Sequence, residues 1–264
     1  MKMDSLFFMF EVSVLASGSS GNCFYIGSDQ GDILIDAGLS CGQIEERLEL
    51  IRKNINNISG IFITHEHIDH IRGIETLSHK YNIPIYLNKG TLINSFLDMG
   101  NINIIRTDQE IDFNGLKILP FAKSHDASEP VSFLIKNKNK KISIMTDIGF
   151  CCENVIENVR ESDLIILESN HDLNMLKNGP YPYFLKKRIA SQRGHISNYE
   201  AALLILEHAN KKMQHVLLSH LSMNNNTPEL ALKTFNSIVN ERSDLKKLKA
   251  WLTYRHRPTD LIKI

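Results

Sequence analysis

The stretch ITHEHIDHIRG, residues 63–73, decides how this sequence is interpreted. It places three histidines and two carboxylates within six positions, directly behind an apolar run. On an extended backbone that leaves a strand, His65 and His67 point to the same side, and Asp69 continues that alternation. His70 would begin the helix that follows. The stretch therefore presents four ligating side chains from one loop at the C-terminal end of a strand.

Imidazole nitrogen and carboxylate oxygen together suit borderline divalent ions such as zinc, manganese or iron. The helical H-E-x-x-H motif of zinc proteases is excluded, because the position four after His65 is Asp69. A solvated polar loop is a poor alternative, since so dense a group of unpaired polar side chains beside a buried strand costs free energy. The stretch predicts a metal site.

Three other apolar runs end in a residue that commonly binds metal. ILPFAKSHD reaches His125, ISIMTD ends at Asp147, and HVLLSH ends at His220. Each one taken alone is more often an ordinary polar residue at a strand end. Three of them, each behind a strand and all in one chain with the histidine cluster, favour a shared site.

The rest of the chain alternates β-rich runs with amphipathic segments, without a low-complexity linker. Residues 197–210 give the clearest helix, with Ser197 as N-cap and Glu200 three residues later. The run Lys136–Lys141 is interpreted as the solvated turn of a hairpin. Strands are predicted over 11–16, 23–27, 32–38, 58–64, 83–87, 102–107, 110–113, 116–124, 130–137, 141–147, 163–169 and 215–219, and further helices over 40–54, 69–81 and 90–100. This order predicts one α/β (α+β) domain over residues 1–264, with sheets inside and helices outside.

The composition argues against a disordered chain, a globally basic nucleic-acid-binding protein and a small disulfide-rich protein. Hydrophobic residues make up 42% and charged residues 23% of the 264 positions, as in globular proteins. Lys+Arg and Asp+Glu both total 30, so any surface that binds nucleic acid must be local. The four cysteines show no CxxC spacing and do not suggest a disulfide framework: Cys23, Cys41, Cys151 and Cys152.

The first residues raise the question of a secretory signal. The apolar run Leu6–Phe10 is short, is flanked by Asp4 and Glu11, and has no clean cleavage site behind it. No apolar stretch approaches the roughly 18 to 20 residues of a spanning helix. We therefore expect no membrane association and a cytoplasmic protein.

HEHIDH, a lone histidine, a lone aspartate after a strand and a late LSH together resemble the metallo-β-lactamase fold hydrolases, whose signature is H-x-H-x-D-H. The resemblance implies a four-layer αβ/βα sandwich whose loops meet around two divalent metal ions, Zn²⁺ or Mn²⁺, with iron as a further option. It also implies which residues bind each ion: His65, His67 and His125 the first, Asp69, His70 and His220 the second, with Asp147 bridging them. Asp36, in ILIDAG, matches an aspartate that orients a ligating loop.

The resemblance becomes narrower over nearly the whole chain. ASGSSGNC, SHDA, ESNHD, GPYP and GHISN together resemble the YycJ/WalJ-type branch, which implies a cytoplasmic, metal-dependent 5′→3′ exonuclease acting on DNA. The interval from Asp147 to His220 is too short for the extra domain of ribonuclease J-like nucleases. The long arm of ribonuclease Z is not evident either. The length and strandedness of the substrate therefore stay open.

Glu168 in ILES and His195 in GHIS resemble the glutamate and histidine of ribonuclease Z and its phosphodiesterase relatives. The resemblance implies that a metal-bridging hydroxide attacks phosphorus, with Asp69 among the catalytic residues as well as the ligands. His195 would act as general acid for the leaving oxygen, oriented and kept protonated by Glu168. Alternatively, the ring of His195 caps the helix that follows.

Candidate substrate contacts lie in three places. The loop Ser17–Asn22, with Ser19 and Asn22, could offer backbone N–H groups to a phosphate, or it is simply a tight turn. His171, in SNHD, could assist a metal or a phosphate, or only hydrogen-bond within its loop. The best local basic patch for a nucleic-acid backbone comprises Lys186, Lys187, Arg188 and Arg193, which Arg255 and Arg257 could join.

Other functions on the same metal site are hydrolysis of a small ester, thioester, β-lactam or cyclic phosphodiester. The pair Glu168 and His195 favours a phosphodiester, because an alkoxide leaving group needs a proton donor. Flavodiiron chemistry would require Glu where His67 stands, together with a flavin domain. A non-enzymatic scaffold is disfavoured because every ligand position is filled. The expected partner is DNA as substrate, and the oligomeric state stays open, with a homodimer as one option.

Overall fold

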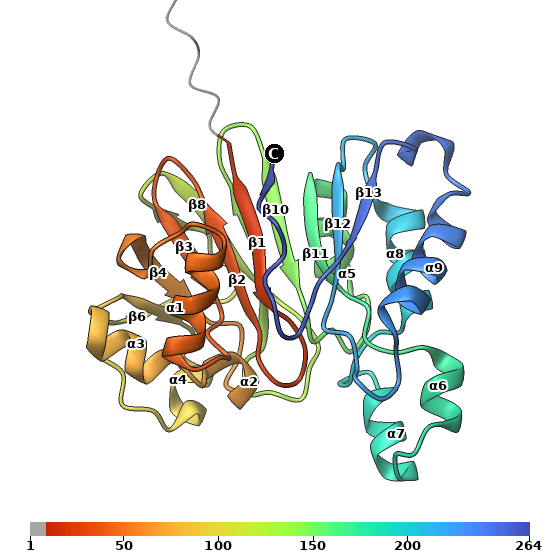
Figure 1. Cartoon of the computed structure of the whole chain (residues 1–264), viewed down its shortest axis with the longest axis horizontal. Helices are drawn as coiled ribbons and strands as arrows, with labels where there is room; N and C mark the ends of the chain where they lie inside the picture. Colours follow the sequence, from red (N-terminus) through yellow and green to blue (C-terminus); the bar gives the residue numbers. More distant parts are fainter. Residues whose placement is uncertain (1–8) are drawn as a thin grey trace, which may run out of the picture.

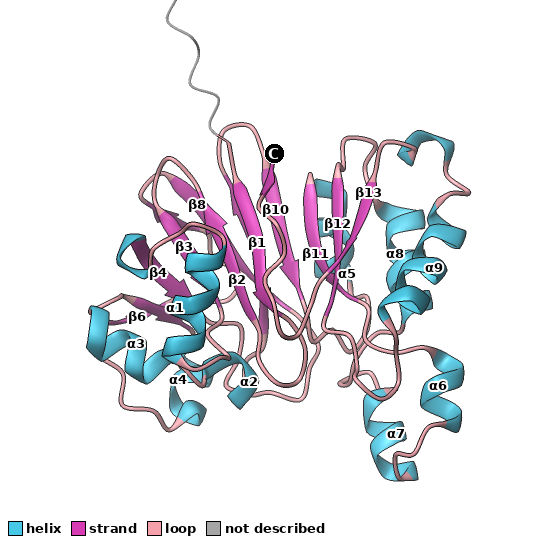
Figure 2. Ribbon diagram, viewed as in Figure 1, coloured by secondary structure: helices cyan, strands magenta, loops and turns pink. Residues whose placement is uncertain are grey.

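The computed structural model describes residues 9–264 and contains two seven-stranded β-sheets that pack face to face (Figures 1 and 2). The first sheet has the order β14-β1-β2-β3-β4-β5-β6. Its strands are β1 (Glu11–Ala16), β2 (Cys23–Gly27), β3 (Asp32–Ile35), β4 (Ile58–Phe62), β5 (Ile85–Leu87), β6 (Ile102–Ile104) and β14 (Ile262–Lys263). The second sheet has the order β13-β12-β11-β10-β9-β8-β7. Its strands are β7 (Ile111–Phe113), β8 (Leu116–Ala122), β9 (Val131–Lys136), β10 (Lys141–Met145), β11 (Leu164–Glu168), β12 (His215–Ser219) and β13 (Lys249–Leu252).

Helices cover the outer face of each sheet and the loop edge between the sheets (Figure 2). They are α1 (Cys41–Leu50), α2 (Ile68–Ile71), α3 (Ile74–Tyr81), α4 (Lys89–Ser95), α5 (Glu153–Glu161), α6 (Leu173–Asn178), α7 (Tyr183–Ile189), α8 (Asn198–His208) and α9 (Pro228–Val239). The helix predicted over 197–210 is α8, and Ser197 and Glu200 form the predicted capping box. None of the helices in this described part of the chain has the length and apolar surface needed to cross a bilayer.

Three apolar layers separate the four layers of secondary structure. The central layer, between the two sheets, contains buried side chains from both, including Phe62 of β4 and Phe133 of β9. A second layer joins the first sheet to α1 and α3, and a third joins the other sheet to α5, α8 and α9. Burial of apolar surface on both faces explains why the strands are nearly continuous hydrophobic runs. The predicted αβ/βα sandwich is confirmed.

Three of the predicted helices have wrong boundaries. The helix expected over 40–54 is α1, which ends at Leu50, before the left-handed Arg52. The helix expected over 69–81 is divided into α2 and α3 at Gly73, whose N–H donates to the carbonyl of Ala37. A Cβ at Gly73 would lie 2.3 Å from the carbonyl oxygen of Leu39, so the chain approaches this loop too closely for any other residue. The helix expected over 90–100 ends at Ser95, because Phe96 adopts a left-handed conformation with φ 54°.

The Lys136–Lys141 run forms the predicted hairpin turn between β9 and β10.

Strands β3 to β6 run parallel to one another, as do β10 to β13. Their carboxyl ends meet at the lower edge of the molecule in Figure 1, where the connecting loops of both sheets gather. This edge is the usual place for a site in α/β proteins.

Candidate metal centre

The residues predicted to bind metal leave the carboxyl ends of four strands at this loop edge. His65 follows β4, His125 follows β8, Asp147 follows β10, and His220 comes directly after β12. Because β4 belongs to one sheet and the other three strands to the second, the site lies where the two sheets meet.

The structure brings all seven predicted ligands together. Their ligating atoms form overlapping groups in which all atoms lie within 4.8 Å of one another. These groups are His65, His67 and His125; Asp69, His70 and His220; His65, His70 and Asp147; and Asp147, Glu168, His195 and His220. Asp147 lies between the two sets of three and contacts members of both. We call the seven predicted ligands the donor cluster.

Two buried polar atoms of the donor cluster lack hydrogen-bond partners in the described structure, Asp147 Oδ2 and His220 Nε2. Asp147 Oδ2 lies 3.2 Å from Nε2 of the ligand His70, so this carboxylate oxygen faces the interior of the cluster. Burying such atoms without a partner costs free energy. A divalent cation would satisfy both, and the mixed nitrogen and oxygen donors suit such an ion. The residues present therefore fit a divalent metal centre.

The electrostatics of the cluster also favour cations. Although burial opposes the charged ring, the carboxylates of Asp36, Asp147 and Asp69 raise the pKa of His70 to about 10. Burial lowers the pKa of His125 to about 4 and that of His65 well below its usual value, so both rings keep a free lone pair at neutral pH. The pKa of Asp147 stays well below its usual value despite burial, because His220 and His70 stabilise the carboxylate.

Asp36 is fully buried behind the donor cluster and orients two of its ligands. Its Oδ2 lies 2.7 Å from His70 Nδ1, which leaves His70 Nε2 facing the centre. Its Oδ1 accepts a hydrogen bond from the N–H of Thr64, whose hydroxyl lies 2.9 Å from His65 Nδ1. Sequence reasoning anticipated Asp36 as an orienting residue but missed Thr64, and its place immediately before His65 is the signal that could have identified it.

Three residues at the ends of strands have a left-handed backbone. The φ angles of Asp36, Asp147 and His220 are 60°, 56° and 57°. Such angles are uncommon for residues other than glycine and carry strain. In each case the chain turns sharply where the strand ends and the side chain lies within the site.

Glu168 is fully buried and connects His195 to the donor cluster. Its Oε1 lies 2.8 Å from His195 Nδ1 and also 2.8 Å from His220 Nδ1, while its Oε2 accepts from the N–H of Ile148. Although burial raises it, these histidines bring the pKa of Glu168 down to about 2. His195 Nδ1 lies 3.7 Å from Asp147 Oδ1, so this ring borders the cluster.

A pocket of about 200 Å³ opens onto the donor cluster. It is lined by Ser19, His67, Asp69, His125, Asp126, Asp147, Leu185, Arg188, Ile189, Gly194, His195 and His220. Ser19 is exposed there, where the sequence placed a substrate contact. The pocket leaves His195 partly exposed beside buried Asp147, as an acid that meets a substrate requires.

The loop Ser17–Asn22 uses most of its backbone N–H groups for hydrogen bonds within the protein. The N–H groups of Ser17, Gly18, Gly21 and Asn22 all donate within the protein. The side chain of Asn22 is fully buried and lies against Asp69 and His70, with its Nδ2 3.0 Å from His70 Nε2. Asn22 therefore supports the ligands and does not face a substrate.

The structure places His171 outside the lining of this pocket. Its ring is buried, outside the pocket lining and outside the groups of ligating atoms, so it does not face a substrate. Arg193 is exposed, and its Nε donates to the carbonyl of His125. Arg188, from the same predicted basic patch, lines the pocket.

Arg255 and Arg257 do not join the basic patch. Arg255 donates to Ser20 Oγ and to the carbonyl of Leu221, holding two loops of the site together. Arg257 stacks over the ring of Tyr254, 3.9 Å from its centroid, on the wall of a different pocket.

Two charged residues of the site were missed by sequence reasoning. Asp126 Oδ1 lies 3.3 Å from His125 Nε2, and Asp126 also forms an ion pair with Arg188. Lys123 is buried, and its Nζ donates to the carbonyl of Thr146. Both flank His125 in the sequence AKSHDA, and that spacing to a predicted ligand was the available signal.

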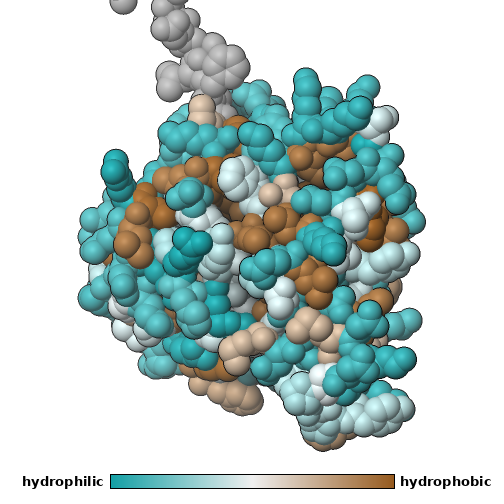
Figure 3. Space-filling model, turned by 45° about the vertical axis from the view of Figure 1, so that its right-hand side comes forward, coloured by the Kyte–Doolittle hydropathy of each residue, from teal (hydrophilic) through white to brown (hydrophobic). Residues whose placement is uncertain are grey.

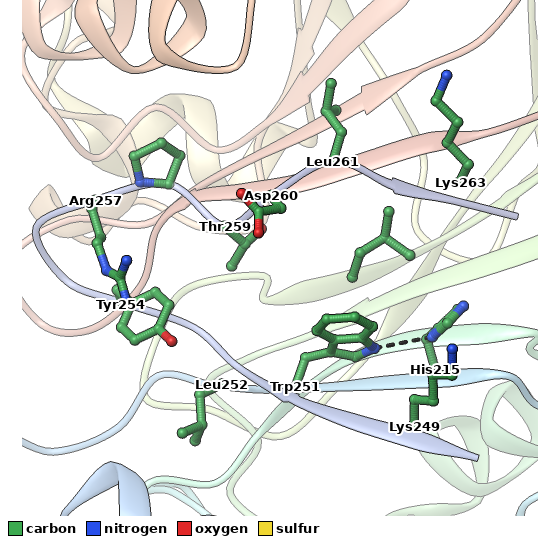
Figure 4. A pocket seen from close by; sticks show the side chains of 12 residues that line it. His215, Lys249, Trp251, Leu252, Tyr254, Arg257, Thr259, Asp260, Leu261 and Lys263 are labelled. Atoms are coloured by element: carbon green, nitrogen blue, oxygen red, sulfur yellow. Dashed lines mark hydrogen bonds between the residues drawn. The ribbon is translucent and has the colours of Figure 1, made fainter. Parts of the chain in front are cut away.

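A larger pocket, of about 530 Å³, lies between β13 and the segment 254–263 (Figure 4). Trp251 Nε1 donates to His215 Nδ1 on one wall, and Asp260 lies on the other. His215 and Asp260 belong to none of the groups of ligating atoms. The smaller pocket, where donors converge, is therefore the candidate site.

Comparison with known proteins gives three kinds of match. Residues 32–221 match the family model described as the Beta-lactamase superfamily domain. The chain is 38% identical over 238 residues to exodeoxyribonuclease YycJ of Bacillus anthracis, covering 87% of this chain and 89% of the relative. It is 35% identical over 232 residues to exodeoxyribonuclease WalJ of Streptococcus pneumoniae, covering 85% and 86%. The crystal structure of the metallo-β-lactamase fold protein YhfI from Bacillus subtilis superposes with a TM-score of 0.72 at 14% identity, over 96% of this chain and 99% of that one, which supports the fold alone.

Proposed function

Because this chain belongs to the β-lactamase superfamily, and within it to the family of the exodeoxyribonucleases YycJ and WalJ, we propose that it degrades DNA from the 5′ end. It is a metal-dependent hydrolase of phosphodiester bonds. The observation that carries this proposal is the place of His195, held by Glu168 at 2.8 Å on the border of a donor cluster that fits divalent metal. A thioester hydrolase would not require such a proton donor, because a thiolate is a much better leaving group than an alkoxide.

The residues divide into two ligand sets. His65, His67 and His125 would hold one ion, Asp69, His70 and His220 a second, and Asp147 would contact both. Zn²⁺ or Mn²⁺ suits these donors, and iron is a further option. When bound, such a pair of ions activates water for attack and stabilises negative charge on the attacking and leaving oxygens.

The protein's own groups position the proton for the leaving oxygen. Glu168 Oε1 accepts the Nδ1–H of His195, which leaves Nε2 to carry a proton towards the substrate. Ser19 lines the pocket and would contact a non-bridging oxygen of the substrate. We place this activity in one domain over residues 1–264 and, since its substrate is DNA, in the cytoplasm.

The test is incubation of 5′- and 3′-end-labelled DNA and RNA with the full chain and added Mn²⁺ or Zn²⁺. We expect the 5′ label to be released first as a short product, while the 3′-labelled strand shortens progressively. Asp147→Ala should abolish release, because the variant lacks the carboxylate shared by both ligand sets. Preferential cleavage of RNA, early loss of the 3′ label or full activity of Asp147→Ala would contradict the proposal.

A further inference from the structure

Residues 173–193, which include α6 and α7, form a projection that we call the arm. It lies below the second sheet and its helices in Figure 1 and protrudes at the lower right of the space-filling view in Figure 3. The whole chain has as many carboxylates as cations, yet the arm contains no Asp or Glu. Its cations are Lys177, Lys186, Lys187, Arg188 and Arg193. The arm is therefore a local positive surface on a molecule whose total formal charge is zero.

Two aromatic side chains of the arm are largely exposed to solvent. Tyr183 and Phe184, at the start of α7, are 71% and 73% exposed, and α7 has no buried residue at all. Helices in proteins are normally stabilised by burying an apolar face. Neighbouring exposed aromatic rings therefore mark an interaction surface.

The cations beside these rings are held in different ways. Lys186 Nζ donates to the carbonyl of Lys177, and Lys187 Nζ lies 4.7 Å from the centroid of the Tyr183 ring. Neither contact neutralises the ammonium charge. Arg188, in contrast, forms an ion pair with Asp126. Lys186 and Lys187 are thus charged groups next to aromatic rings.

The inner side of α7 adjoins the candidate site. Leu185, Arg188 and Ile189 line the pocket that opens onto the donor cluster. The N–H of His195 donates to the carbonyl of Ile189, so the end of α7 is bonded to the segment that carries the proposed acid. A strand lying along the arm would enter the pocket beside His195.

We propose that the arm binds an unpaired segment of the DNA strand next to the cleaved bond, an inference that rests on the proposed function. Tyr183 and Phe184 stack on bases, while Lys186 and Lys187 contact phosphates. Stacking requires an exposed base face, which a strand offers only when it is unpaired, and every base has such a face. Cations without intervening carboxylates complement a phosphate backbone.

The proposed stacking of bases on Tyr183 and Phe184 is tested with the full chain and Mn²⁺, using a Tyr183→Ala/Phe184→Ala double variant. We compare kcat/KM for a single-stranded oligonucleotide with kcat/KM for a bis-aryl phosphodiester, which fits in the pocket that neither Tyr183 nor Phe184 lines. The ratio should fall about 10-fold or more, through a higher KM for the oligonucleotide. Phe96→Ala is the matched control, because Phe96 is 89% exposed next to α4 and does not line the pocket. A thermal unfolding curve for each variant checks the fold.

The proposed phosphate contacts of Lys186 and Lys187 are tested by the salt dependence of oligonucleotide binding. A phosphorothioate oligonucleotide that resists cleavage is titrated by fluorescence anisotropy against the wild type and a Lys186→Gln/Lys187→Gln variant. Each lost phosphate contact to a single strand should reduce the slope of log K against log salt by about 0.7. Duplex DNA without unpaired ends should bind the wild type more weakly than the single strand does.

The outcomes separate the two proposals. If the wild type cleaves DNA but the arm variants keep its substrate ratio and salt slope, the arm proposal is overturned and the proposed function stands. If the double aromatic variant keeps its KM but changes from dimer to monomer in light scattering, the arm is an interface between copies, which also overturns it. If the wild type neither cleaves nor binds DNA, the proposed function itself fails.

Discussion

Glu168 Oε1 is shared by two histidine rings with different tasks. It lies 2.8 Å from Nδ1 of His195, the proposed acid, and 2.8 Å from Nδ1 of His220, a proposed ligand. A carboxylate that accepts from a ligating imidazole orients the ring and makes it a better ligand. One glutamate therefore supports both proton donation and metal binding, and the two functions are coupled.

Replacing Glu168 or His195 should have separable effects. His195→Ala should slow DNA cleavage by about 10² to 10⁴-fold while leaving metal affinity near that of the wild type. Glu168→Gln should slow cleavage and also weaken metal binding by about 10 to 100-fold, because His220 loses its carboxylate partner. Kinetics on labelled DNA and calorimetric titration with Mn²⁺ measure the two effects. Equal metal affinities in both variants would show that the contact with His220 has no effect on binding.

Residue-level prediction succeeded where the signal was local. The spacing from His65 to His70, and the strand ends at His125, Asp147 and His220, were visible in the sequence and predicted residues that the structure brings together. The burial of Asn22 behind the ligands was not visible, because it depends on a loop 47 residues away in sequence that carries Asp69. The sharing of Glu168 likewise requires β11 and β12 to be paired.

Helix α8 begins directly after the segment that carries His195. Ser197 Oγ accepts from the N–H of Glu200 and caps the helix, two residues after His195. Helix α9 begins similarly, with Thr227 Oγ1 accepting from the N–H of Leu230, 3.1 Å away. The two caps are similar in chemistry, but only the first is linked by a short stretch of chain to the proposed acid.

Removing each cap should separate stability from activity. Ser197→Ala and Thr227→Ala should each lower the free energy of unfolding by about 1 kcal/mol, measured by urea denaturation. Ser197→Ala should also reduce DNA cleavage, because the segment from His195 loses its anchor to the helix. Thr227→Ala serves as the matched control with wild-type cleavage below its unfolding range. Equal cleavage by both variants would argue that the cap does not position His195.

At the level of elements, most strands could be located along the chain from the sequence, because burial on both faces leaves long apolar runs. The division between α2 and α3 was not predictable locally. It depends on the approach of Gly73 to the loop after β3, which lies far away in sequence. The early end of α4 depends on a left-handed Phe96, for which the sequence has no glycine signal.

The two sheets of the molecule are joined at the donor cluster as well as through their common core. Ser17, after β1, accepts from the N–H of His220, after β12, and its hydroxyl lies 2.6 Å from that of Ser219. The ligands come from loops of both sheets, and they include the buried carboxylate of Asp147 and the unpaired Nε2 of His220. An ion bound there would cross-link the halves and offset the repulsion among Asp36, Asp69 and Asp147.

Metal should therefore change the stability of the whole molecule. At a free metal concentration of 100 times Kd, binding to the folded state alone should add about 2.7 kcal/mol to the free energy of unfolding. Urea unfolding with Mn²⁺ and with EDTA measures this difference, and Asp147→Asn should show a smaller one. Identical unfolding midpoints with and without metal would show that no ion binds in the folded state.

The left-handed backbone at Asp36, Asp147 and His220 sets stability against function. Glycine would suit the dihedral angles at all three positions, yet it has no carboxylate or imidazole. Laboratory evolution that rewarded heat resistance alone would be drawn towards glycine there and would dismantle the chemistry of the molecule. The chain keeps three strained backbone conformations because its reactive centre requires the side chains at those positions.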